Sequence, residues 1–386
     1  MKRLLPFCLI LVLLLTGCST WLDGSYSSVT PHKADTTPVD IGDAAVSNYL
    51  ELYVALRRMV ESVTVSGMLQ VPDYDEQLLP GDMDRALRTL RRENPYAVYA
   101  LEEAEWELGT TGGKRVVAVT MTYSKAKAEV LRIRSVDGEQ DCMDHIADAL
   151  EQCDDRLVLH IKRYTGSDFV QMVEDYAMEN PHIVMEIPKT TAISYPENGT
   201  ERIVELTFTY ENSRDRLRHM RSQVTPVFRA AVLNVSGDAE APEKFELLYS
   251  FLMERHNYTV NTSITPAYSL IRHGEGDAKA FATVYAAMCR AAELQCVVIT
   301  GTRDGEAWYW NLLYDGENWH HLDLLRCNQG GEGFRWYTDA EMTGYVWDYA
   351  QYPASVLQPL PTPAVPMETT APTATTVPPE TAAQAE

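Results

Sequence analysis

Three neighbouring residues, His320, His321 and Asp323, have side chains that could carry out acid–base chemistry. They lie on an alternating segment, 319–324, which predicts a strand with His321 and Asp323 on one face and His320 on the other. A histidine beside a carboxylate can take up and return a proton near neutral pH. No nucleophile or metal-ligand partner is visible beside them, so a structural role is favoured, with one histidine packed and the other solvated.

Cys289 is the first cysteine after Cys153, and a thiolate beside an imidazole would be a nucleophile. It lies late in an apolar helical stretch, and its alanine and methionine neighbours indicate a packed thiol rather than a relocated nucleophile. The seven cysteines have neither the spacing of a zinc site nor that of a disulfide scaffold. We therefore expect no metal and no cofactor.

A C-terminal domain of residues 240–353 must position these side chains. Its pattern predicts an amphipathic helix, a glycine-containing turn, a long apolar helix and three strands. A helix packed on an antiparallel sheet is an α+β arrangement. The expected elements are the helix 245–256, the turn 273–276, the helix 277–292 and strands near 296–300, 308–314 and 319–324.

Two stretches of this domain resemble the bacterial transglutaminase-like superfamily, whose fold is related to papain. They read AYSLIRHGEGDAKAFATVYAAMCRAAELQCVVITGT and WYWNLLYDGENWHHLD. In that family a Gly-x-Cys turn begins the central helix and supplies the nucleophile, a His-Ala-Trp-Asn strand brings the base, and an aspartate on the next strand orients it. The resemblance implies a papain-like, transglutaminase-type α+β fold over roughly 244–353.

The chain departs from the family pattern at two of these three positions. Gly276-Asp277-Ala278 stands where the Gly-x-Cys turn is expected, so the nucleophile position is Ala278. Trp308 begins the segment that corresponds to His-Ala-Trp-Asn, so it takes the place of the base. Asp323 keeps the family identity. The resemblance therefore implies a domain without the cysteine and histidine that its chemistry requires.

Aromatic side chains are unusually dense in this domain, and aromatic faces can stack on sugars or hold a peptide. Most are expected in the core, and the tryptophan matching Trp310 packs there in the family. Trp308 remains a candidate groove residue. The candidate binding residues are Trp308, His321 and Asp323.

An internal duplication precedes this domain. Glu93-Asn94-Pro95 recurs as Glu179-Asn180-Pro181, and Thr122-Tyr123 recurs as Thr209-Tyr210 at nearly the same offset. Each copy reads as a β-α-β-β-α module. The expected bounds are 46–150 and 151–235. Such modules more often serve as spacers or docking surfaces than as catalysts.

Cys142 and Cys153 stand in and after the second helical stretch of the first copy. A short-loop disulfide and two half-buried thiols remain equal alternatives, because the sequence does not fix the distance between their Cα atoms.

The first residues indicate export. Lys2 and Arg3 precede an apolar run, 4–15, of the length of a signal peptide rather than a membrane span. The run ends in Leu15-Thr16-Gly17-Cys18, which resembles the bacterial lipobox, so we expect cleavage after residue 17 and lipid on Cys18. The chain is then extracytoplasmic and anchored to a bacterial membrane by acyl chains.

The flanking segments and the charge complete this organisation. Residues 18–45 read as a flexible spacer, and the Pro/Thr/Ala-rich 354–386 as a disordered tail. The chain has 386 residues, with 33 Lys+Arg, 55 Asp+Glu and a net charge of −22, and 45% of them are hydrophobic. Such acidity disfavours nucleic acid as a partner.

Three hypotheses follow. The favoured one is a lipoprotein whose catalytically degenerate transglutaminase-like domain is not an enzyme and acts as a binding or structural module at the cell envelope, with peptidoglycan or an envelope protein as partner. The alternative is an active transglutaminase-like peptidase, amidase or acyltransferase acting on peptides or cell wall. In the third, the duplicated modules dock a partner protein and the C-terminal domain is a cap.

Overall fold

The computed structural model describes residues 39–40, 45–235, 237–254, 257–259, 263–331 and 333–352. The expected signal peptide 1–17, Cys18 and the tail 354–386 lie outside these residues, as does nearly all of the spacer 18–45. The chain divides into two compact units, 1–132 and 133–386. No helix in the described ranges is long and apolar enough to cross a membrane.

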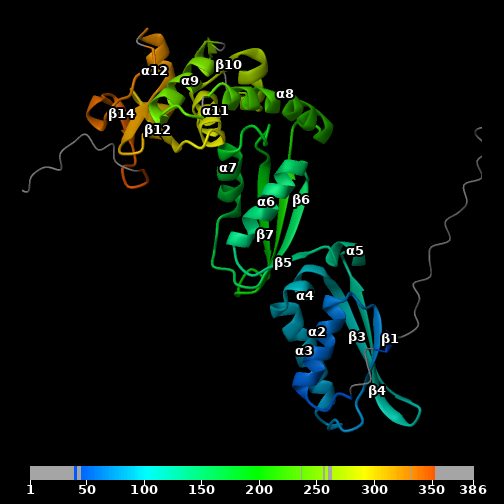
Figure 1. Ribbon diagram of the computed structural model, residues 1–386. Helices are drawn as coiled ribbons and strands as arrows, with labels where there is room; N and C mark the ends of the chain where they lie inside the picture. The colour runs from blue at the N-terminus through cyan, green and yellow to red at the C-terminus, as the bar shows by residue number, and fades with distance from the viewer. Residues whose placement is uncertain are drawn as a thin grey trace, which may run out of the picture. The chain divides into compact units, whose positions relative to one another are not determined.

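The first unit is a four-stranded sheet with helices on one face (Figure 1). Its strand order is β1-β2-β4-β3, with β1 and β2 parallel and the other pairs antiparallel. Buried apolar residues recur on one side of each long helix and meet the alternating inward residues of β4, such as Val117 and Val119. The elements are β1 (Val39–Asp40), α2 (Tyr49–Glu61), β2 (Ser66–Gln70), α3 (Leu79–Glu93), α4 (Pro95–Ala100), β3 (Leu101–Thr111), β4 (Lys114–Tyr123) and α5 (Lys127–Val130).

A second sheet with the equivalent order, β5-β6-β8-β7, opens the second unit. Its parallel pair is β5 with β6, and the rest is antiparallel. Leu159, Ile161 and Phe208 face two helices in its core. The elements are β5 (Arg134–Val136), α6 (Gln140–Gln152), β6 (Arg156–Ile161), α7 (Phe169–Glu179), β7 (Lys189–Tyr195) and β8 (Arg202–Thr209).

The repeated sequence landmarks occupy equivalent places in the two sheets. Asn94 ends α3 and Asn180 ends α7, while the Thr-Tyr pairs lie at the ends of β4 and β8. Counted from β2 and from β6, each copy has the expected β-α-β-β-α order, apart from the short α4 in the first copy. In each sheet a further strand and helix, β1 with α2 and β5 with α6, precede these elements. The expected boundary at 150/151 is wrong, because α6 packs into the second core through Cys142 and Ile146. The units divide at 132/133.

The C-terminal domain packs helices against an antiparallel sheet of order β13-β12-β11-β14. The central helix α11 is buried along almost its whole length, and alanines let it lie close to its neighbours. The elements are α8 (Arg214–Leu233), α9 (Ala241–Met253), β9 (Asn257–Tyr258), α10 (Pro266–Tyr268), η1 (Ser269–His273), β10 (Glu275–Gly276), α11 (Ala278–Ala291), β11 (Cys296–Arg303), β12 (Glu306–Tyr314), β13 (Trp319–Leu322), α12 (Leu324–Gln329), η2 (Asp339–Glu341) and β14 (Tyr345–Trp347).

Two contacts fix this sheet against its neighbours. The buried Asn311 of β12 donates from Nδ2 to the Ala282 carbonyl of α11 at 2.9 Å. Gly301 of β11 leaves room for the backbone of β14, because a Cβ atom there would lie 2.3 Å from the Val346 carbonyl oxygen. The first contact holds the central helix α11 against β12, and the second lets the edge strand β14 lie close to β11.

Three arginines of α8 bind the carboxyl end of α6. Arg214 Nε, Arg218 Nη2 and Arg221 Nη1 donate to three successive carbonyls at 3.0, 3.3 and 2.6 Å, those of Cys153, Gln152 and Glu151. These are among the carbonyls that a helix end leaves unpaired, and cations are favourable there. The helix α8 therefore connects the second sheet to the C-terminal domain through hydrogen bonds from these three arginines.

Cys142 and Cys153 are both free thiols. They are eleven residues apart along α6 and its cap, which separates their Cα atoms by about 16 Å. A disulfide requires these atoms to lie within about 7 Å. The structure therefore excludes the disulfide alternative for this pair.

Candidate functional site

Asp323 is the centre of the candidate site and is held by its own helix. It follows β13 and is the N-cap of α12, where its Oδ1 accepts from the backbone N–H groups of Leu325 and Arg326 at 3.0 and 3.1 Å. Only 1% of Asp323 is exposed. An aspartate at an N-cap satisfies amide groups that a helix leaves unpaired, so this local sequence fixes the carboxylate.

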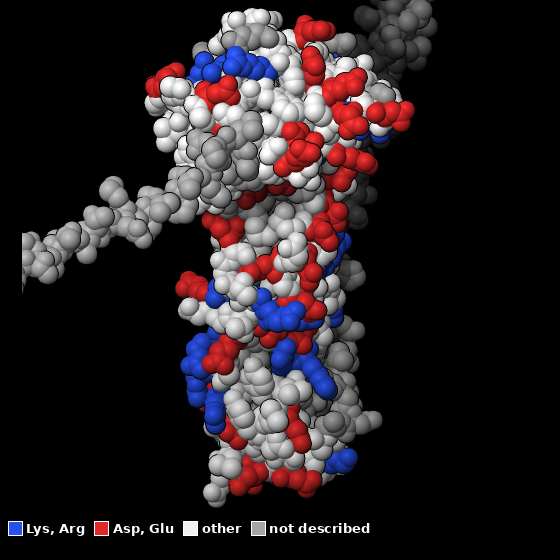
Figure 2. Space-filling model, turned by 60° about the vertical axis from the view of Figure 1, so that its left-hand side comes forward, with Lys and Arg blue, Asp and Glu red and all other residues white. Residues whose placement is uncertain are grey.

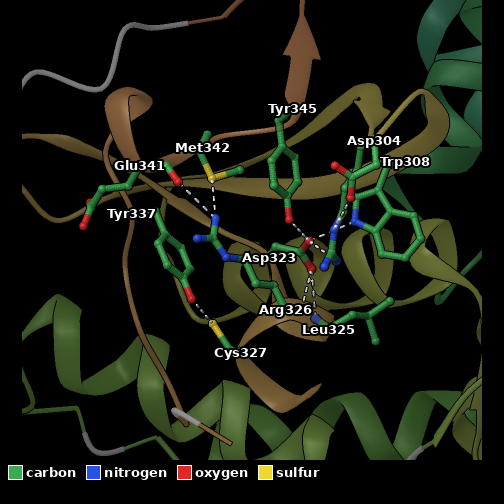
Figure 3. Close-up of polar contacts among 11 residues, drawn as sticks. Asp304, Trp308, Asp323, Leu325, Arg326, Cys327, Tyr337, Glu341, Met342 and Tyr345 are labelled. Carbon is green, nitrogen blue, oxygen red and sulfur yellow. Dashed lines mark hydrogen bonds and ion pairs between the residues drawn. The ribbon is translucent and has the colours of Figure 1, made fainter. Parts of the chain in front are cut away.

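The second carboxylate oxygen receives three donors from other elements (Figure 3). Trp308 Nε1 lies 2.9 Å, Tyr345 Oη 2.6 Å and Arg303 Nη1 3.3 Å from Asp323 Oδ2. Burial, followed by the Asp323 carboxylate, raises the pKa of Tyr345 far above its ordinary value, so the phenol stays a donor. Five donors thus occupy the two oxygens of Asp323.

Arg303 also lies over the rings of the two aromatic partners of this carboxylate. Its guanidinium carbon lies 5.2 Å from the Trp308 ring centroid and 5.6 Å from that of Tyr345. Its side chain is 25% exposed, so part of it meets solvent. Sequence reasoning missed Arg303 and Tyr345, because the strands β11 and β14 that carry them become neighbours only in the folded sheet.

Ala278 is the buried first residue of α11 and has no reactive group. The N-cap Asp277 accepts from the Ala280 N–H at 2.8 Å, and Gly276 pairs with Tyr258 in the short β9–β10 ladder. The Tyr258 ring centroid lies 5.9 Å from that of Trp308. Tyr258 thus links the turn before Ala278 to Trp308, so the three family positions belong to one region.

His321 does not bind Asp323. It is 1% exposed, its Nδ1 accepts from Trp310 Nε1 at 3.0 Å, and its Nε2 donates to Asp339 Oδ1 at 2.8 Å. Burial outweighs Asp339 and lowers the pKa of His321. The imidazole is a neutral bridge between β12 and the η2 turn, and no open face remains for a substrate.

His320 is also packed, so the expectation of one solvated histidine is wrong. It is 8% exposed, its ring centroid lies 4.4 Å from that of Trp336, and its Nε2 pairs with Asp315 Oδ2 at 2.7 Å. Each buried imidazole thus has an acidic partner outside its strand, Asp315 in the turn after β12 for His320 and Asp339 in η2 for His321. Strand alternation does not reveal these partners.

Cys289 is buried completely, and burial raises the pKa of its thiol well above the ordinary value. A thiol in such surroundings stays protonated and is a poor nucleophile. In the described part of the chain no cluster of histidine, cysteine and acidic side chains could hold a metal ion.

Charge on the visible surface is mixed. Figure 2 shows red carboxylate side chains spread over the face in view, with blue basic side chains in smaller groups among them. The excess of acidic residues is thus distributed over this face.

Residues 229–324 match the Transglutaminase-like superfamily. The chain therefore contains a transglutaminase-like domain, and the matched range includes Ala278, Trp308 and Asp323. No curated protein matches the chain.

Three solved structures are similar at low identity. One is a TGase, at 10% identity and TM-score 0.24, over 50% of this chain and 58% of that one. A Cytophaga hutchinsonii protein, proposed to be a cysteine protease, has 17% identity and TM-score 0.25, over 41% and 70%. A Parabacteroides distasonis protein, proposed to be a protease, has 9% identity and TM-score 0.22, over 67% and 39%. The chain thus spans 58% of the first structure's length, and TM-scores this low carry no functional conclusion.

Proposed function

We propose that the transglutaminase-like domain is catalytically degenerate and acts as a binding module at the cell envelope. The bond from Trp308 Nε1 to Asp323 Oδ2 carries this proposal. In the resemblance, that carboxylate orients a catalytic imidazole. Here an indole N–H takes its place, and an indole can neither accept nor release a proton at neutral pH. Ala278 supplies no thiolate for such a base to activate.

The anchoring part of the proposal rests on the sequence before residue 19. Lipid on Cys18 would hold the chain on the outer side of a bacterial membrane, and in the sequence two tandem α+β modules separate this anchor from the binding domain. The paired rings of Trp308 and Tyr258 offer a partly exposed aromatic surface for a cell-wall ligand.

Co-sedimentation of residues 19–386 with purified peptidoglycan tests the binding role. We expect the wild type to sediment, Trp308→Ala to stay in solution, and Trp308→Phe to retain much of the binding because its ring remains. Trp319→Phe is the matched control, since Trp319 belongs to the same sheet but packs on Tyr314. Equal sedimentation of wild type and Trp308→Ala would contradict a role for this surface.

A second assay addresses catalysis directly. Incubation with a peptide bearing a thiol-reactive electrophile should leave the folded domain unlabelled, because its cysteines are packed and Ala278 cannot react. Covalent labelling of any residue in the candidate site, or hydrolysis of a peptide amide that Asp323→Asn abolishes, would instead support the peptidase or acyltransferase alternative.

A further inference from the structure

A cavity of about 470 Å³ lies beside the start of α11, where the second sheet meets the C-terminal domain. It is lined from the sheet side by residues at the start of β7 and the end of β8, and from the domain side by the segment before α10 and by Lys279. We propose that this cavity binds the free carboxylate and small side chains of a cell-wall peptide stem. This proposal rests on the proposed function and extends it by naming a ligand class.

Two lysines approach the cavity without acidic partners. Within the described ranges, neither Lys189 nor Lys279 has a carboxylate oxygen within 4.0 Å of its Nζ. Lys279 lies instead over the Tyr309 ring, 5.5 Å from the centroid. Two such ammonium groups from separate elements favour an anion, which would receive charge-assisted hydrogen bonds from both.

The position of Lys279 strengthens this inference. It is the second residue of α11, and no acidic residue stands in that first turn. A cation at the amino end of a helix opposes the helix dipole, and the N-cap Asp277 offsets only part of this cost, because one of its oxygens accepts from the Ala280 N–H. An anion bound in the cavity would offset this repulsion and gain from the dipole as well.

The other residues that line the cavity indicate which class of molecule carries the anionic group. Ile187 and the half-exposed Ile264 offer apolar surface. The Glu186 carboxylate is occupied, since it accepts from the Glu211 and Asn212 N–H groups and from Asn212 Nδ2. Glu211 remains exposed at the rim and can pair with an amine. A short peptide with small apolar side chains, a carboxylate and an amino group matches this combination, and wall peptide stems have that chemistry.

Binding of a soluble stem peptide to the full chain from residue 19, measured by calorimetry, tests the proposal. The probes are a stem peptide with a free terminal carboxylate and the same peptide amidated there. We expect amidation, Lys189→Gln and Lys279→Gln each to weaken binding at least tenfold, since a hydrogen bond to a charged group is worth at least that much. Lys114→Gln, in the first unit, is the charge-matched control and should bind like the wild type.

The possible outcomes distinguish a failure of the cavity proposal from a failure of the proposed function. If peptidoglycan and stem peptide both bind, but neither amidation nor the lysine variants change the affinity, the cavity proposal is contradicted. The proposed binding role of Trp308 is then unaffected. If an unrelated peptide with a free carboxylate binds as tightly as the stem peptide, the wall peptide is overturned as the ligand. If the wild type binds neither probe nor peptidoglycan, the proposed function itself fails. Circular dichroism of each variant shows whether it is folded, and Lys279→Gln should melt no lower than the wild type.

Discussion

Trp308 donates its indole N–H to the carboxylate of Asp323, so a side chain without acid–base chemistry occupies the hydrogen bond that a catalytic imidazole would need. The proposed function interprets this bond as a catalytic pair whose base has been replaced by an indole. Tyr345 and Arg303 bind the same oxygen, which makes Asp323 a structural junction between β11, β12, β14 and α12.

Trp308→Phe removes one donor from Asp323 and keeps an aromatic ring. We expect the free energy of unfolding to fall by about 1.5–3 kcal/mol, the usual cost of losing a hydrogen bond to a charged group. Urea denaturation followed by circular dichroism measures it. Trp319→Phe should cost less, and an equal loss in both variants would show that ring size alone matters.

Asp323→Ala leaves three donors without their acceptor and removes the cap of α12. The expected loss is about 3 kcal/mol or more, as for other buried charges stripped of a partner. Asp323→Asn keeps one acceptor oxygen and should lie between this variant and the wild type. Thermal melting of the three proteins gives the order, and an unchanged melting temperature for the alanine variant would contradict the junction.

Acid should destabilise the C-terminal domain through His321. Its folded pKa lies below the ordinary 6.5, so the unfolded chain binds this proton at a higher pH than the folded domain does. The stabilisation is fully present above pH 6.5 and is lost as the pH falls from there through the folded pKa. Urea midpoints should therefore drop as the pH falls below the ordinary histidine pKa of 6.5. His182, whose pKa burial also lowers, contributes in the same direction, and NMR titration of each imidazole separates the two.

Thiol reagents should modify the folded chain slowly. Burial raises the pKa of Cys142 to about 12 and raises that of Cys289 well above its ordinary value. Labelling with iodoacetamide, read by peptide mass spectrometry, should reach both residues only after urea is added. Rapid native labelling of Cys289 would revive it as a nucleophile.

Gly301→Ala would place a Cβ against the backbone of β14 and the ring of Trp310. We expect a loss of about 3 kcal/mol, at the upper end for overpacking, because backbone cannot move aside like a side chain. Gly81→Ala in α3 meets no atom within 4 Å and should gain about 0.5–1 kcal/mol from helix propensity. The two melting temperatures should move in opposite directions.

Local patterns were sufficient for the elements that carry the family positions. Strand alternation located β12 and β13, and the apolar run from Asp277 located α11. The partners of Asp323 were not predictable, because Arg303 and Tyr345 reach it from strands separated by more than forty residues. The acidic partner of His321, Asp339, was not predictable either, because it begins η2, eighteen residues further along the chain. The module boundary failed because the amphipathic pattern of α6 does not tell which neighbouring sheet its apolar face will cover.

The arginine row of α8 restricts how the chain length can vary. Arg214, Arg218 and Arg221 meet successive carbonyls of α6 only because four- and three-residue steps return to one helix face. Inserting or deleting one residue between Arg214 and Arg221 would rotate the following part of α8 by about 100° and turn the later arginines away. Homologues should therefore keep this spacing constant and confine their insertions to loops such as the one between α8 and α9.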